Sequence, residues 1–224
     1  MSQEIDLKQL ERKAWRSVFQ DGLWDIYLGL LLLAMAVLML LSDSGLSESQ
    51  SMLIYIGFLA VSMLAMWAGK RFITVPRMGR VKFGPKGKAR KRKARVVLAI
   101  SVLVGVVVFF IALLAIKGNW SEGLSLQFII PAIWSVNMLG VFGLGAYFLD
   151  FDRLYLIGLM YALALPVLIL TDELLGIDLG FIAFAVPAAL ILLIGSVVFV
   201  RFLRAYAVLA EEGPPAERAL NANQ

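Results

Sequence analysis

Two pairs of aspartates are the residues of this sequence best suited to chemistry. Asp21 and Asp25 lie four residues apart, so on a helix they share one face, and Asp150 and Asp152 form a second pair. Paired carboxylates of this kind can hold Mg²⁺ on a diphosphate group. The alternative is helix capping, because a carboxylate at the start of a helix accepts backbone N–H groups. We favour capping by Asp21 and Asp152, and we predict no catalytic residue, no metal site and no cofactor.

Cysteine and histidine are both absent from the chain. Their absence excludes disulfides, thiolate nucleophiles, zinc sites built on Cys or His, haem bound through His, and catalytic triads with an imidazole base. A non-catalytic role is therefore favoured over an enzymatic one.

The most conspicuous feature is a basic loop, residues 70–95, which holds twelve Lys or Arg and no acidic residue. β-branched and aromatic residues on both sides of residues 76–79 predict a short β-hairpin in its first half. The charge predicts docking to anionic lipid headgroups, at roughly 1 kcal/mol for each basic residue near the membrane surface. An acidic protein partner could use the same charge, whereas nucleic acid is the least favoured ligand because no RNA-binding fold accompanies it. The simplest alternative is a signal that only keeps this loop from crossing the membrane. The candidate lipid- or partner-binding residues are Arg77, Arg80, Lys82, Lys86, Lys88, Arg90, Lys91, Arg92, Lys93 and Arg95.

A third candidate region is the apolar run 128–149, which contains polar and small residues deep within it. Polar side chains at such depth face protein or a cavity, and small residues let helices approach closely. Two interpretations are open: a tightly packed helix with Asn137 bonded to a neighbour, or a substrate path. The residues concerned are Asn137, Ser135, Gly140, Pro166 and Pro187.

These residues need elements to position them, and the composition indicates that the elements are membrane-spanning helices. The 224 residues are 61% hydrophobic and 17% charged, and the mean hydropathy is +0.85. Six apolar runs are long enough to cross about 30 Å of hydrocarbon at 1.5 Å per residue. We therefore predict an all-α membrane protein of six transmembrane helices, spanning residues 22–41, 52–69, 96–116, 128–149, 154–170 and 181–200.

The distribution of charge predicts the orientation of these spans. Twenty of the twenty-one Lys and Arg residues fall in segments on one side, and Lys117 alone falls on the other. Because cytoplasmic loops carry the excess of basic residues, we expect both termini in the cytoplasm and a plasma (inner) membrane location. Residues 1–21 predict an amphipathic helix at the membrane interface, residues 22–209 the transmembrane domain, and residues 210–224 a disordered tail.

No characterised family is assigned from the sequence. The stretch PRMGRVKF, residues 76–83, resembles a segment of uncharacterised prokaryotic membrane proteins, and that resemblance implies no function.

Three functions remain open. The favoured one is a non-catalytic accessory or scaffold component that engages anionic lipids or an acidic partner through the basic loop. A homo-oligomer is also possible. The second is a small transporter or channel that uses the last three spans. The third is a Mg²⁺-dependent enzyme acting on a lipid or prenyl phosphate.

Overall fold

A computed structural model describes residues 19–42, 44–78, 85–117, 126–176 and 179–206 of the chain. Every regular element in these residues is helical, which confirms the all-α prediction for the described part. The elements are α2 (Leu23–Ser42), α3 (Glu48–Ala68), the π-helical segment η1 (Gly69–Thr74), α4 (Val75–Met78), α5 (Pro85–Lys117), α6 (Leu126–Leu149), α7 (Arg153–Leu175) and α8 (Gly180–Ala205). The predicted interfacial helix, apart from residues 19–21, and the predicted tail lie outside the described residues.

Five helical stretches are long and apolar enough to cross a membrane, which indicates a multi-pass membrane protein. They are Leu23–Ser42, Glu48–Arg77, Ile129–Leu149, Arg153–Asp172 and Gly180–Ala205. The predicted third span lies within α5, whose described apolar part is the shorter stretch Arg95–Val107.

The predicted β-hairpin in the basic loop is wrong for the residues that the structure describes. The chain continues from α3 into η1 and α4 without a break, and α5 already begins at Pro85. An isolated two-stranded hairpin is marginally stable, whereas a continued helix satisfies its backbone groups within the segment. Residues 79–84, in the expected second strand, lie outside the described part.

Local caps make two spans longer than predicted. α3 begins early because Ser47 and Gln50 form a capping box: the Ser47 hydroxyl accepts from the Gln50 N–H, and the Gln50 side chain accepts from the Ser47 N–H. α7 continues to Leu175, where Gly176 ends it in the left-handed conformation with φ 62°.

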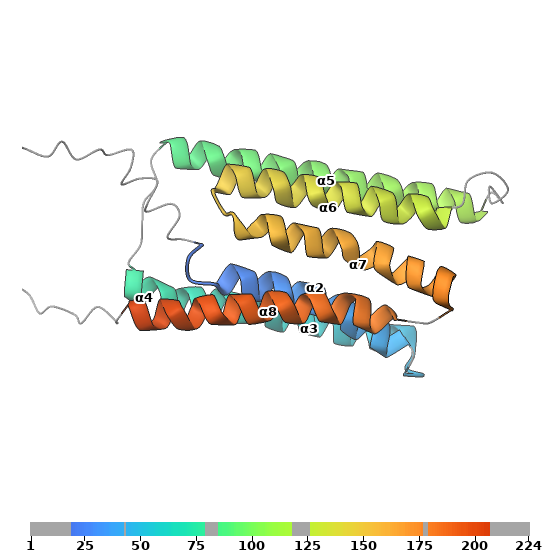
Figure 1. Ribbon diagram of the computed structural model, residues 1–224, viewed down its shortest axis with the longest axis horizontal. Helices are drawn as coiled ribbons and strands as arrows, with labels where there is room; N and C mark the ends of the chain where they lie inside the picture. Colours follow the sequence, from blue (N-terminus) through green and yellow to red (C-terminus); the bar gives the residue numbers. More distant parts are fainter. Residues whose placement is uncertain (1–18, 43, 79–84, 118–125, 177–178, 207–224) are drawn as a thin grey trace, which may run out of the picture.

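The helices run back and forth along one long axis and form two groups of three (Figure 1). In the first group α2 packs most extensively against α8 and also against α3; in the second, α6 packs against both α5 and α7. Contacts between α7 and α8, with fewer between α2 and α7, join the groups. Buried residues of α2, α7 and α8 provide much of the core, including Leu32, Ala164, Phe184, Ala188 and Ile191.

Hydrogen bonds near Pro166 link α6 to α7. Pro166 has no N–H, so the carbonyl of Ala162, four residues earlier, loses its helical donor. The Ser135 hydroxyl lies 2.7 Å from that carbonyl oxygen and 2.9 Å from the Pro131 carbonyl oxygen of its own helix, and the shorter contact is the one across to α7. Trp134 Nε1 donates to the Tyr161 carbonyl at 2.9 Å. Ser135 and Pro166 therefore serve helix packing, one of the two roles expected for them.

We predict that Ser135→Ala lowers the free energy of unfolding by about 1–2 kcal/mol, because it leaves a buried carbonyl unsatisfied. In a Pro166→Ala background the restored N–H takes that carbonyl, so the same substitution should cost less than half as much. A double-mutant cycle of SDS-induced unfolding measures the difference. Equal costs in the two backgrounds would show that Ser135 does not compensate for the donor that Pro166 lacks.

Candidate functional site at the basic end of the bundle

Asp21 lies completely buried at the end of the bundle where α2 begins and η1 and α4 lie (Figure 1). Its Oδ2 accepts from Lys70 Nζ at 2.6 Å and from the Thr74 hydroxyl at 2.7 Å. Its Oδ1 accepts from the backbone N–H of Leu23 at 3.3 Å, so the capping role predicted for Asp21 is confirmed. Lys70 and Thr74 are four residues apart in the segment η1, which presents both side chains to one carboxylate.

Asp25, one turn further along α2, is also completely buried and pairs with a different cation. Arg153 Nη2 at the start of α7 lies 2.9 Å from Asp25 Oδ2 and donates to the carbonyl of Phe19 at 2.6 Å. Within the described part of the chain, no aligned hydrogen bond reaches either oxygen of Asp25, so the contact with Arg153 is an ion pair without hydrogen-bond geometry. The guanidinium also lies 5.2 Å from the ring centroid of Phe151.

Close backbone contacts hold these acids inside the protein. Gly22 has φ +73°, and a Cβ there would lie 2.5 Å from the carbonyl oxygen of Gly195 in α8. A Cβ on Gly195 would in turn lie 3.0 Å from the Cβ of Asp25. α8 therefore covers the acidic face of α2, and the paired cations bring α3 and α7 to the same end.

The four predicted aspartates do not form one metal-binding cluster. Asp21 and Asp25 are each engaged by a separate cation, and Asp152 is exposed. The capping role predicted for Asp152 is wrong, because its side chain makes no cap hydrogen bond to α7. Asp150 adopts φ 53° in the short turn between α6 and α7. Among the described residues, no group of three or more acidic side chains is placed to hold a metal ion. The two ion pairs balance in charge and hold the helices together.

The predicted lipid- or partner-binding residues do not all occupy the same kind of position. Arg77 donates to the carbonyls of Leu203 and Tyr206 at 3.2 and 2.8 Å, so it fixes the end of α8. Arg92, Lys93 and Arg95 have exposed side chains on the first turns of α5. Lys86, Lys88, Arg90 and Lys91 belong to the start of α5, and Arg80 and Lys82 lie outside the described residues.

An apolar groove opens beside these basic residues, between α2 and the group formed by α5, α6 and α7. Its volume is about 410 Å³. Arg95 is the one charged residue among the described residues that line it. The lining residues are Phe19, Trp24, Leu28, Arg95, Val97, Leu98, Val141, Phe142, Gly145, Leu149, Phe151 and Leu154. We call this the α2–α5 groove.

A second hollow, of about 520 Å³, lies against the first turns of α5 and the end of α6. Arg92 and Lys93 line it, and Lys93 Nζ lies 5.7 Å from the ring centroid of Phe148. Val97 borders both this hollow and the α2–α5 groove. The exposed cations that the structure describes in α5 thus all adjoin apolar space: Arg95 lines the α2–α5 groove, and Arg92 and Lys93 line the second hollow.

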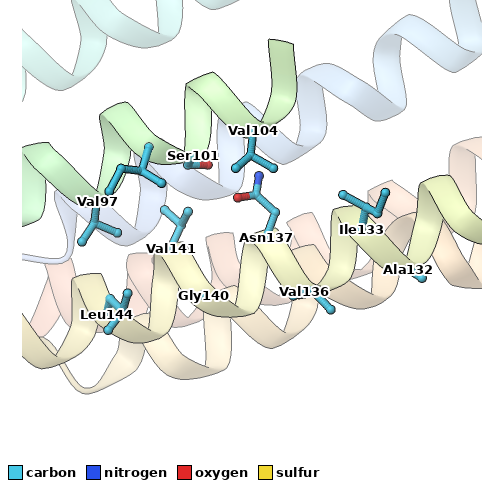
Figure 2. A pocket seen from close by; sticks show the side chains of 11 residues that line it. Val97, Ser101, Val104, Ala132, Ile133, Val136, Asn137, Gly140, Val141 and Leu144 are labelled. Carbon is cyan, nitrogen blue, oxygen red and sulfur yellow. The ribbon is translucent and has the colours of Figure 1, made fainter. Parts of the chain in front are cut away.

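Asn137 occupies a third hollow, of about 480 Å³, between α5 and α6. Its side chain points towards α5, near Ser101 and Val104 (Figure 2). The structure describes no hydrogen bond from its carboxamide, so the predicted bond to a neighbouring helix is not found among the described residues. Gly140 lines the same hollow, and a Cβ added there would meet nothing within 4 Å, so it is not a point of close helix contact.

The residues of the predicted substrate path do not lie together in one cavity. Asn137 and Gly140 border α5, whereas Ser135 and Pro166 belong to the contact between α6 and α7. Pro187 lies within α8 and lines none of the three hollows. A path along the last three spans is left as a prediction.

Comparison with known proteins gives no further assignment. No family model, no curated protein and no solved structure matches this chain.

Proposed function

We propose that this protein is a non-catalytic membrane component that binds anionic lipid headgroups through the basic turns of α5. The observation that carries the proposal is the exposure of Arg92, Lys93 and Arg95, which are close together along one helix and adjoin apolar hollows. Lys70 and Arg153 at the same end are instead paired with buried aspartates. Arg71, Arg201 and Arg204 are exposed as well, but the cations of α5 are the ones that line the α2–α5 groove and the hollow beside it.

The proposal includes six spans and a cytoplasmic basic end. α5 continues as a helix to Lys117 and lies alongside α6, which supports its assignment as the predicted third span and brings the total to six (Figure 1). The basic first turns of α5, the start of α7 and the end of α8 gather at one end of the bundle, and α3 begins at Glu48 at the other (Figure 1). This distribution fits the positive-inside rule with the basic end in the cytoplasm.

Orientation can be tested directly because the chain has no cysteine. In intact cells that express the protein, a membrane-impermeant maleimide should label a Ser44→Cys variant and leave a Lys93→Cys variant unlabelled. The Lys93→Cys variant should react fully once the membrane is permeabilised. If only the Lys93→Cys variant is labelled in intact cells, the orientation is the reverse of the one proposed. If both variants are labelled, the two positions lie on the same side of the membrane.

Lipid binding is tested by native mass spectrometry of the purified protein titrated with phosphatidylglycerol or phosphatidylcholine. The wild type should prefer the anionic lipid. Replacing Arg92, Lys93 and Arg95 by Gln removes roughly 3 kcal/mol of surface attraction, so the affinity for phosphatidylglycerol should fall about 100-fold. The loss should shrink in high salt, which screens exposed charges.

The matched control replaces three exposed arginines on other helices, Arg71, Arg201 and Arg204, by Gln. It removes the same charge from the same end and should change the affinity less than tenfold. Equal losses in the two triple variants would reduce the effect to net charge and contradict a site on α5. The wild type could instead show no preference for the anionic lipid and retain an acidic protein in fixed stoichiometry. That result would identify the ligand of α5 as a protein partner rather than a lipid.

A further inference from the structure

We infer that the α2–α5 groove holds one acyl chain of a bound anionic phospholipid, with the lipid phosphate on Arg95. The inference deepens the proposed function and rests on it. It assigns the lipid to a defined crevice rather than to a diffuse basic surface.

The shape and lining of the groove fit a hydrocarbon chain. Its volume of about 410 Å³ lies within the roughly 300–1,000 Å³ typical of sites for small molecules. Leu98 and Val141 form part of one wall, Trp24 and Leu28 part of another. Apart from Arg95 and the indole N–H of Trp24, the described lining has no polar side-chain group, so the groove offers a water-soluble ligand almost nothing to bond.

The charge at the groove selects the lipid. Arg95 is exposed, and the structure describes no acidic side chain paired with it. A guanidinium binds phosphate oxygens through paired N–H donors, which makes arginine well suited to this group. Arg92 is three residues earlier on the same helix, so a second cation lies within reach of the headgroup.

The position of the groove favours a lipid of the surrounding bilayer over a soluble ligand. Three of the helices around the groove, α2, α6 and α7, are long and apolar enough to cross a membrane, and Leu98 on its α5 wall is 56% exposed. A chain can enter sideways from the bilayer while its phosphate remains level with the basic turns of α5. The stacked rings of Phe19 and Phe151, with centroids 5.1 Å apart, belong to the groove lining.

The test fills the groove without removing charge. Leu98→Trp and Val141→Trp place a large ring in it, and Leu103→Trp is the control because Leu103 is 65% exposed and lines none of the three hollows. In native mass spectrometry with phosphatidylglycerol, the wild type and Leu103→Trp should retain one tightly bound lipid. Leu98→Trp and Val141→Trp should each lose at least tenfold in affinity. Arg95→Gln should lose as much, and Arg95→Lys should recover part of it.

A second measurement uses no variant that fills the groove. Phosphatidylglycerol with brominated acyl chains, at low mole fraction in phosphatidylcholine, should quench the fluorescence of Trp24 more strongly than that of Trp67. Trp67 is 55% exposed and lines none of the three hollows, so it reports the average composition of the bilayer. The fluorescence of Trp24 is the difference between the wild-type signal and that of Trp24→Phe, and the fluorescence of Trp67 is obtained from Trp67→Phe in the same way.

The outcomes separate the two proposals. If the wild type prefers phosphatidylglycerol but both groove-filling variants bind as the wild type does, and Trp24 is quenched no more than Trp67, the groove is not the site and only this inference fails. If the wild type binds phosphatidylcholine as tightly as phosphatidylglycerol, both this inference and the proposed function are contradicted.

Discussion

Gly22→Ala should be among the most destabilising single substitutions in the described part of this protein, with a loss of about 3 kcal/mol or more in the free energy of unfolding. Two effects add. A Cβ at φ +73° costs roughly 1–2 kcal/mol in backbone strain. The same Cβ would lie 2.5 Å from the Gly195 carbonyl oxygen and 2.8 Å from the Phe199 nitrogen, and such overpacking costs about 1–3 kcal/mol more. Both neighbours are backbone atoms, so α8 itself must move.

The chain provides two matched controls for this experiment. Gly45 has the same φ of +73°, and a Cβ added there would meet nothing within 4 Å, so Gly45→Ala isolates the backbone strain and should cost about 1 kcal/mol. Gly140→Ala, within a helix and with open space around it, should leave stability unchanged or slightly raised. SDS-induced unfolding followed by tryptophan fluorescence measures all three. A Gly22→Ala loss no larger than that of Gly45→Ala would disprove the close contact of α2 with α8.

Arg153→Met should produce the second large effect. It leaves Asp25 completely buried without its cation and removes the donor to the Phe19 carbonyl. Breaking a buried pair by removing one partner typically costs about 3–5 kcal/mol, because the remaining charge is uncompensated. The double variant Asp25→Asn/Arg153→Met should recover at least half of this loss, since a neutral amide tolerates burial better than a lone carboxylate.

The control for Arg153 is Arg71→Met, which removes an exposed cation 5.4 Å from the Trp67 ring and should change stability by less than about 0.5 kcal/mol. Unfolding of the wild type, the two single variants and the double variant in a double-mutant cycle gives the coupling energy between Asp25 and Arg153. Additive losses would mean that Arg153 acts through Phe19 alone.

Helix type and approximate position could be predicted from the sequence because they depend on local apolar runs. Five of the six predicted spans coincide with stretches able to cross a membrane. The errors lie where one segment continues another: β-branched residues after Lys70 suggested strands, yet the backbone continues α3 as a helix. Strand propensity is weak and is overridden when a helix already supplies the hydrogen bonds.

The partners of the aspartates could not be predicted, although Asp21 and Asp25 themselves stood out. Lys70 is 49 residues from Asp21 in the sequence, and Arg153 reaches Asp25 from the start of α7. Which cation meets which acid depends on how closely the helices approach, and that depends on Gly22 and Gly195. The glycines are visible in the sequence, but no local pattern predicts which of them lie at a contact between two helices.

The pairing of α2 with α8 has a consequence for biogenesis. α2 is the earliest of the described helices to be synthesised and α8 the last, so Gly22 and the α2 surface that carries Gly29 have no α8 to pack against until synthesis of these helices is complete. Lys70 arrives with the end of α3 and can neutralise Asp21 almost at once, whereas Asp25 waits for its cation until α7 brings Arg153. Until α7 has been made, the chain therefore holds Asp25 without the cation that pairs with it in the finished bundle.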